Sequence, residues 1–125
     1  MTSREQAHVR RCFSKLKRAR LTPFSAKGLP DVPDKQGVYI IYAPRSRRVV
    51  HVGRTYRGTR GLFRRLKNHL QGASSFTAHF LNGNGRRLRR GYAYRYLSVD
   101  LARRRALLEL YATGYLCPAH LGTSE

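Results

Sequence analysis

Two segments rich in Val, Ile and Tyr, separated by a short turn, constrain the fold of this chain more than any other feature. Residues 37–43 have the sequence Gly-Val-Tyr-Ile-Ile-Tyr-Ala, and residues 49–53 have the sequence Val-Val-His-Val-Gly. β-Branched and aromatic residues favour strands, so two such runs joined by a few residues predict an antiparallel hairpin. Because side chains alternate along a strand, Tyr39 shares a face with Ile41, and His51 shares a face with Gly53.

Helices are predicted on both sides of the hairpin. Ser3 and Gln6 have the spacing of a capping box, which indicates a helix from about residue 4 to residue 20. One side of this helix is apolar, and the other side is almost entirely Arg and Lys. A second helix is expected over residues 62–71, with a buried stripe made of Leu62, Phe63, Leu66 and Leu70.

The second half of the chain predicts a further strand and a further long helix. Ser74 and Ser75 could cap a short helix that ends near Leu81, before an Asn-Gly-Asn-Gly turn. The alternating, Tyr-rich segment 91–99 is expected to be a strand. Asp100 is the expected N-cap of a helix over residues 101–116, with an inner face formed by Leu101, Leu108, Ala112 and Tyr115.

These elements predict an α+β fold in one compact domain, with the order β-β-α-(α)-β-α behind a basic helical arm. A chain of 125 residues suffices for a single modest core. Residues 1–35 are expected to form a basic helical arm and a connector containing Pro and Gly, and residues 36–125 the sheet and the other helices. The basic face of the arm is interpreted either as a solvated surface or, with slight preference, as a contact to a phosphate backbone.

The charge of the chain is strongly unbalanced. It contains 26 Lys and Arg residues against 6 Asp and Glu, which gives a formal net charge of +20. A charge of this sign and size favours a polyanionic partner, because binding releases the counterions of the polyanion. Nucleic acid is therefore the expected partner. A membrane surface is not expected, because the charge is spread over strands, turns and helices rather than along one amphipathic helix.

Hydropathy and cysteine content indicate a soluble, cytoplasmic protein. No apolar run approaches the ~20 residues of a membrane span, and the first residues lack the apolar core of a secretory signal. Cys12 and Cys117 are too few for a disulfide framework and lack the CxxC spacing of a zinc site. Both are interpreted as packing residues.

Five residues that suit phosphodiester chemistry occur in order along the chain. They lie in the two predicted hairpin strands, in the helix that follows and in the last predicted helix: Tyr39, His51, Arg65, His69 and Glu109. Between Asp34 and Asp100 the chain contains no Asp or Glu. Glu109 is therefore one of very few carboxylates that could hold a metal ion.

The order of these motifs resembles that of the GIY-YIG nuclease family. Residues 37–39 correspond to the first motif and residues 51–53 to the second, and Cys117-Pro118 resembles the proline that ends the family's glutamate helix. The resemblance covers residues 36–122, so that residues 36–125 would form a GIY-YIG-like nuclease domain. It implies a three-stranded antiparallel sheet flanked by helices and metal-assisted hydrolysis of phosphodiesters in DNA.

Two positions depart from the family pattern. His51 stands where the second motif has tyrosine, and the asparagine often found after the proline is absent. His120 could take that polar place. Because a histidine titrates near ~6.5 and the surrounding positive charge lowers its pKa, His51 is expected to be the general base or a direct partner of the base.

The resemblance and the chemistry together assign the other roles. Glu109 is expected to bind one Mg²⁺ or Mn²⁺, because such a hard cation accepts a single carboxylate and keeps water and phosphate oxygens as its other ligands. Arg65 would present its planar fork to the reacting phosphate. Tyr39 would orient the attacking water, and His69 would hold the water or a phosphate oxygen.

Further residues are expected to contact phosphates beside the site. One group directly follows the second motif, and another lies in the loop before the last strand. Thr55 is included because its hydroxyl could share a phosphate with the neighbouring guanidinium. The predicted DNA-binding set is Arg54, Thr55, Arg57, Arg60, Arg64, Lys67, Arg86, Arg87, Arg89 and Arg90.

Taken singly, these residues have simpler interpretations. Tyr39 could pack in the sheet, and Arg65 and His69 could form a solvated helix edge. Glu109 could pair with Arg105 one turn earlier. Taken together, they favour a one-metal endonuclease acting on duplex DNA without a small-molecule cofactor, with a homodimer possible. A catalytically silent DNA-binding module of the same fold and a nuclease acting on RNA are the alternatives.

Overall fold

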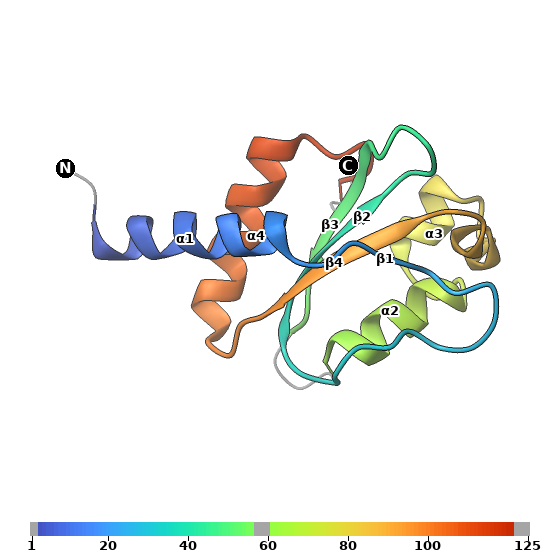
Figure 1. Cartoon of the computed structure of the whole chain (residues 1–125), viewed down its shortest axis with the longest axis horizontal. Coiled ribbons are helices and arrows are strands. Elements are labelled where there is room, and N and C mark those ends of the chain that lie inside the picture. Colours follow the sequence, from blue (N-terminus) through green and yellow to red (C-terminus); the bar gives the residue numbers. More distant parts are fainter. Residues whose placement is uncertain (1–2, 57–60, 122–125) are drawn as a thin grey trace.

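An antiparallel sheet of four strands lies between helices in the computed structural model, which describes residues 3–56 and 61–121 (Figure 1). Three helices, α1, α2 and α4, pack directly on the strands, so the fold is α+β. In chain order the elements are α1 (Arg4–Arg18), β1 (Thr22–Pro23), β2 (Gly37–Tyr42), β3 (Val49–Arg54), α2 (Leu62–Leu70), α3 (Ser75–Phe80), the 3-10 helix η1 (Gly85–Arg89), β4 (Ala93–Ser98) and α4 (Ala102–Leu116). Within the two described ranges, no helix has the length and apolar character needed to cross a membrane.

The sheet has one strand more than the three predicted. Its order is β1-β4-β2-β3, and all neighbouring strands are antiparallel. The additional strand, β1, pairs Thr22 and Pro23 with β4 at the sheet edge, inside the segment that is predicted to be an irregular connector. Proline tolerates an edge position because it has no amide proton to donate there. Two residues are too few to produce an alternating pattern, so nothing in the sequence marks this strand.

The predicted hairpin is confirmed as β2 and β3. Tyr39 pairs with Gly53 and Ile41 with His51, so these side chains share one face of the sheet. The Tyr39 ring lies across Gly53, where an added Cβ would overlap the phenol. A glycine at this position therefore allows the tyrosine to cross the neighbouring strand.

Each face of the sheet carries its own core. On one face, α2, α3 and η1 cover a cluster of Phe24, Tyr39, Ile41, Val50, Leu62, Leu66, Leu70, Phe76, Leu81, Leu88 and Tyr94. On the other face, α1 and α4 cover a cluster of Phe13, Leu16, Val38, Ile40, Tyr42, Val52, Val99, Leu108 and Ala112. Figure 1 shows these two groups of helices on opposite sides of the sheet. Helix α1 thus packs on the sheet through its apolar side, and its Arg and Lys side chains are exposed.

Two helices begin with capping boxes. The predicted box of Ser3 and Gln6 is confirmed at α1, where each side chain bonds to the backbone amide of the other residue. Ser74 forms a second box with Thr77 at the start of α3. Both boxes satisfy amide groups that a helix N-terminus leaves without an internal partner.

The prediction for α4 is wrong in two details. Leu101, not Asp100, occupies the N-cap position, and its side chain makes no capping bond. Leu101 and Tyr115 are 60% and 63% exposed, so they are not part of the inner face. Arg105 is buried there instead. The prediction failed because an apolar periodicity cannot assign a charged residue to the buried side of a helix.

The chain after α4 pairs with part of the outer edge of β3. Cys117 has a left-handed conformation (φ 47°), which ends the helix just before Pro118. The Ala119 and His120 amides then donate to the carbonyls of Val49 and Val50 at 3.2 and 2.9 Å. The first half of the strand edge is thereby covered.

Candidate active site

A pocket of about 250 Å³ lies at the edge of β3. Because β3 is the last strand of the sheet, helices from both faces reach this pocket, α2 from one side and α4 from the other. Its walls bring together three of the five residues predicted to be catalytic: His51, Arg65 and Glu109. Arg54, Tyr56, Ser75 and His120 also line it.

Helix α2 places Arg65 at the pocket. The helix starts after Gly61, where the surrounding backbone leaves no room for a Cβ, and the Asp34 carboxylate accepts a hydrogen bond from the Arg64 amide at 3.2 Å. Asp34 thereby replaces the missing N-cap side chain. Arg65 is half-buried and donates from Nε to the Tyr39 hydroxyl at 3.2 Å. The orientation of the guanidinium therefore depends on Tyr39.

A chain of hydrogen bonds runs from Tyr39 into the protein. The Tyr39 hydroxyl lies 2.6 Å from His69 Nε2, and His69 Nδ1 lies 2.6 Å from Ser74 Oγ. Ser74 Oγ in turn lies 3.0 Å from Thr77 Oγ1. All four residues are buried, and both Tyr39 and His69 are 0% exposed.

The direction of each bond follows from Thr77, because a backbone carbonyl can only accept. Thr77 donates its one hydroxyl proton to the Ser74 carbonyl at 3.0 Å, so the Ser74 hydroxyl donates to Thr77. Ser74 Oγ therefore accepts from His69 Nδ1, and neutral His69 accepts the proton of Tyr39 on Nε2. The Tyr39 oxygen also accepts from Arg65.

Tyr39 and His69 are both neutral at physiological pH. Burial raises the pKa of Tyr39 to about 12, although the Arg65 guanidinium opposes this change. Burial lowers the pKa of His69 well below its ordinary value, and the charges of His51 and Arg65 act in the same direction. Both residues are fully buried and bonded behind Arg65, so their predicted contact with the attacking water or a phosphate oxygen stays a prediction. Their position suits them to orient Arg65.

His51 is fixed at the pocket wall. Its ring stacks on Phe76, with the centroids 4.7 Å apart and the planes 23° apart. Its Nδ1 lies 3.2 Å from Nδ1 of His120, and its Nε2 is buried without a partner among the described residues. Burial lowers the pKa of His51 to about 3, and the charges of His120 and Arg65 add to this effect. The ring is therefore neutral and able to accept a proton, but burial matters more for this than charge.

Glu109 reaches the pocket from α4 and pairs with Arg54 at the end of β3. Glu109 Oε1 lies 3.1 Å from Arg54 Nη1, and the two side chains are 19% and 24% exposed. Burial raises the pKa of the Glu109 carboxyl, even though Arg54 and Arg65 both act to lower it. The ion pair thus compensates only partly for the lost hydration, and a further cation beside the carboxylate would be stabilised.

Arg105, the alternative partner considered for Glu109, is engaged elsewhere. It is 3% exposed, and its guanidinium donates to the carbonyls of Thr55 (3.2 Å), Val99 (3.0 Å) and Asp100 (2.6 Å). The simple helical pair of Arg105 and Glu109 is therefore not formed. These three bonds tie the end of β3 to the start of α4, and so help to fix Glu109 relative to the strand.

The capacity of the pocket for a metal ion depends on one carboxylate. Across residues 3–56 and 61–121, no three His, Cys, Asp or Glu side chains form a group that could hold a metal ion. Glu109 offers a single hard oxygen donor at the pocket. This donor fits Mg²⁺ or Mn²⁺, which retain water and phosphate oxygens as further ligands, and it does not fit a metal that prefers sulfur or several imidazoles.

Thr55 does not have the surroundings of a phosphate-binding residue. It is 2% exposed, and its hydroxyl accepts from the Gly37 amide at 3.0 Å and donates to Gln36. It joins the start of β2 to the end of β3. The predicted contact of this hydroxyl with a phosphate stays a prediction, and it would require Thr55 to leave these bonds.

The arginines and the lysine predicted to bind phosphates differ in whether their side chains are already bonded within the protein. Arg89 donates from Nη1 to the carbonyls of Ser25 and Gly28, both at 2.8 Å, so its guanidinium holds the connector after β1. Arg57 and Arg60 lie outside the described residues. The others are exposed or half-buried and stay candidates for phosphate contact: Arg54, Arg64, Lys67, Arg86, Arg87 and Arg90.

Two residues shape the site in ways that the sequence did not predict. His120 contacts His51 although 69 positions separate them, and the only signal for it was its place just after Pro118. Arg105 was considered only as a surface partner of Glu109, and nothing in the sequence indicated its burial, because an arginine in a basic helix is usually interpreted as part of the solvated face.

Comparison of the chain with protein-family models, with curated proteins and with solved structures finds no match. The assignment of a function therefore depends on the residues of the pocket and on the charge of the chain.

Proposed function

We propose that the chain is a divalent-metal-dependent DNA endonuclease of the GIY-YIG type that hydrolyses phosphodiester bonds with one metal ion. The observation that carries the proposal is the meeting of a neutral base, a cation and a carboxylate in one pocket: His51, Arg65 and Glu109. Hydrolysis of a phosphodiester needs a group that takes a proton from water and positive charge at the phosphoryl and leaving oxygens. The pocket contains a candidate for each need.

His51 takes the proton of the attacking water in this proposal. Its ring is neutral, its position is fixed by Phe76, and its Nε2 has no partner among the described residues. General bases of this kind contribute about 10²- to 10⁴-fold to a rate. The strongly lowered pKa makes His51 a weak base in the free protein, and the negative charge of a bound phosphate makes it a stronger one.

Arg65 provides positive charge for the phosphoryl oxygens. Its Nε donates to the Tyr39 hydroxyl. Because the guanidinium is planar, the two terminal nitrogens can still donate to a phosphate while Nε is held in this way. Lysine has no equivalent of Nε and would lose either the contact with Tyr39 or the contact with phosphate. An Arg65→Lys variant should therefore be a poor enzyme.

Glu109 is the residue that would hold the metal ion. A bound divalent cation would stabilise the negative charge that develops on the reacting phosphate and the leaving oxygen. Arg54 pairs with Glu109 in the structure, so it must share the carboxylate or move when a cation binds there. Since Arg54 lines the same pocket, it would then be available to a neighbouring phosphate.

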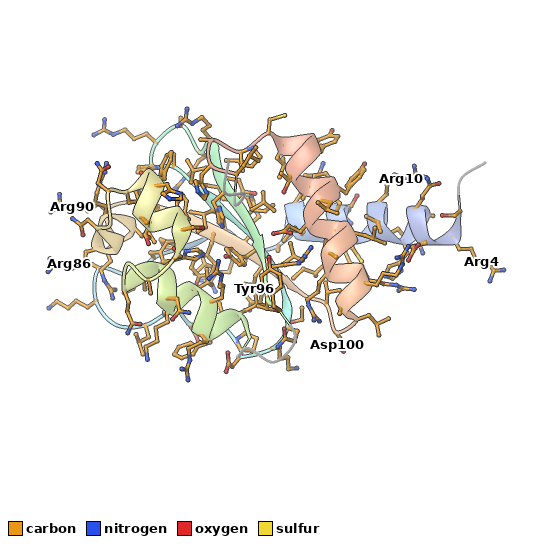
Figure 2. The ribbon with its side chains drawn as sticks, turned by 180° about the vertical axis from the view of Figure 1, so that it is seen from behind. Arg4, Arg10, Arg86, Arg90, Tyr96 and Asp100 are labelled. Atoms are coloured by element: carbon orange, nitrogen blue, oxygen red, sulfur yellow. The ribbon has the colours of Figure 1, made fainter. Side chains whose placement is uncertain are left out.

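The charge distribution supports a long polyanion as the partner. Figure 2 shows Arg86 and Arg90 extending from one end of the molecule and Arg4 and Arg10 at the other end. Positive charge thus lies at both ends of the molecule, and the net charge is +20. A duplex has regularly spaced phosphates over this whole length, which a short substrate does not. We therefore expect DNA to contact more of the surface than the pocket alone.

A plasmid-nicking experiment tests the proposal. Supercoiled DNA is incubated with the wild-type chain in Mg²⁺, in Mn²⁺ or in EDTA, and relaxed and linear products are quantified. We expect nicking in either metal, none in EDTA, and a loss of at least ~10²-fold in Glu109→Gln. Glu5→Gln is the matched control, because Glu5 lies on α1 and pairs with Arg103 away from the pocket.

The outcomes separate the alternatives. Binding without cleavage in both metals would contradict the proposal and favour a catalytically silent DNA-binding module. Cleavage of a labelled RNA at a higher rate than a DNA duplex of equal length would show that RNA is the substrate. One pocket cuts one strand, so linear product that forms together with the nicked product would indicate a dimer.

A further inference from the structure

Four of the five histidines gather beside the pocket. The ring of His51 lies 5.3 Å from that of His69 and 5.2 Å from that of His120, and the ring of His79 lies 5.9 Å from that of His120. A cluster of histidines next to a candidate base can provide a route for protons.

Only one of these neighbours can exchange a proton with His51. His69 uses Nε2 for Tyr39 and Nδ1 for Ser74, so neither of its nitrogens is available. His120, by contrast, presents Nδ1 to Nδ1 of His51 at 3.2 Å. The His120 backbone is fixed to β3 through the Val50 carbonyl, so this contact does not depend on a flexible side chain alone.

A contact between two Nδ1 atoms requires one donor and one acceptor. In the neutral pair, one ring therefore carries its proton on Nδ1 and the other on Nε2. When His51 is the Nδ1 donor, its Nε2 holds a lone pair at the buried position where no described residue bonds to it. His120 is then protonated on Nε2 and receives the bond on Nδ1. The tautomers of the two rings are thus complementary.

We infer that His120 is a second proton carrier, which accepts the Nδ1 proton of His51 while His51 Nε2 takes a proton from the attacking water. This inference builds on the proposed function and extends it. His120 does not touch the reacting atoms in this scheme. It acts through His51, and its effect is that positive charge does not accumulate on the more deeply buried ring.

The proton balance of the step is simple. Water gives one proton to His51 Nε2, the resulting hydroxide oxygen bonds to phosphorus, and the bond from phosphorus to the leaving oxygen breaks. The Nδ1 proton of His51 passes to His120 Nδ1, so His51 ends neutral and His120 carries both ring protons. His120 then loses its Nε2 proton and the leaving oxygen takes up one proton from solvent. Because His120 Nε2 is buried without a partner among the described residues, a water molecule must reach this nitrogen to carry the proton away. The step leaves His51 protonated on Nε2 and His120 on Nδ1, so both rings exchange protons with water before the next turnover.

Variants at His120 test this scheme, with His8→Gln as a control on α1, away from the pocket. His120→Ala should lower kcat by about 10²-fold and leave DNA affinity unchanged, and imidazole added to this variant should restore much of the loss. His120→Gln can still form a hydrogen bond with His51 Nδ1 but cannot carry a proton. We expect it to be as slow as His120→Ala.

A kcat within twofold of wild type in His120→Gln would show that His120 only positions His51, and would overturn the inference. So would a failure of imidazole to restore any activity to a folded His120→Ala.

Nitrogen NMR of the wild-type rings provides a readout that needs no variant: we expect one Nδ1-protonated and one Nε2-protonated ring, and two identical tautomers would contradict the pairing. A wild-type chain that cuts in no metal contradicts the proposed function itself, whereas a cutting wild type with an unaffected His120→Gln contradicts only the relay.

Discussion

Tyr39 determines how Arg65 is presented, although it does not itself reach the pocket. Its oxygen accepts from Arg65 Nε and its proton goes to His69, so one hydroxyl serves two neighbours. The ring crosses the neighbouring strand at Gly53, where any side chain would overlap it. A residue with no exposed surface is thus as important to the site as those that line it.

Removal of this hydroxyl should affect both stability and cleavage. Tyr39→Phe leaves His69 Nε2 without its donor in a buried position, and we expect a loss of about 1–3 kcal/mol in the free energy of unfolding. Cleavage should fall because Arg65 loses its fixed orientation. Tyr42→Phe is a suitable control, because Tyr42 is buried on the opposite face and its hydroxyl bonds to no described residue. Urea denaturation and a nicking assay measure the two effects, and equal stability of the two variants would contradict the hydrogen-bond chain.

The buried histidines should make stability depend on pH. Burial holds the pKa of His51 at about 3 and that of His69 well below its ordinary value, so both stay unprotonated in the folded chain. In the unfolded chain each binds a proton below about pH 6.5. Stability is therefore fully present above that pH and falls as the pH decreases towards about 3, by roughly 1.4 kcal/mol per pH unit for each ring.

Urea denaturation between pH 7 and pH 4.5 measures this dependence. His51→Gln removes one of the two rings and should show a smaller slope than the wild type. A free energy of unfolding that is unchanged between pH 7 and pH 5 would mean that the rings are accessible to protons in the folded state.

At the scale of the elements, Arg105 connects β3, β4 and α4. Its buried guanidinium donates to carbonyls at the ends of both strands and just before the helix.

Charge-assisted bonds of this kind contribute roughly 1.5–3 kcal/mol, so Arg105→Met should lower the free energy of unfolding by at least about 2 kcal/mol. Arg103→Met, which removes only an exposed pair with Glu5, should leave it nearly unchanged, because water screens such a pair. Thermal denaturation of the two variants makes the comparison, and similar losses would contradict a structural role for Arg105.

The main elements could be predicted from the sequence because their signals are local. Alternation identifies the hairpin, and the spacing of Ser3 and Gln6 identifies the start of α1. Strand β1 has only two residues and depends on pairing with β4, so it leaves no local pattern. Boundaries and edge strands of this kind are fixed by tertiary contacts rather than by propensity.

For the site, too, the sequence identified individual residues but not the contacts between distant parts of the chain. The order of motifs selected His51, Arg65 and Glu109, which the structure brings to one pocket. It could not show that Tyr39 and His69 are enclosed behind Arg65, because burial results from the packing of α2 and α3 on the sheet. Nor could it show that Glu109 meets Arg54 rather than the nearer Arg105.

For the whole molecule, the net charge of +20 predicts a steep dependence of DNA affinity on salt. Each neutralised phosphate contributes about −0.9 to the slope of log K against log salt, so six to ten contacts reduce affinity by roughly 10³- to 10⁵-fold between 50 and 200 mM. Fluorescence anisotropy with the Glu109→Gln variant measures binding without cleavage. A slope near zero would contradict electrostatic binding, and a slope of −1 to −2 would limit contact to the pocket alone.

The position of the pocket between two helix layers also links activity to the completion of folding. Arg65 belongs to the layer on one face of the sheet and Glu109 to the layer on the other, so both layers must be docked before the two side chains meet. Under the proposed function, a chain still being synthesised, or one that has lost only α4, would keep most of its positive charge and bind nucleic acid. It would not cut, because Glu109 is translated after β3 and α2. Cleavage would then require a completely assembled fold, which would limit damage by incompletely folded molecules.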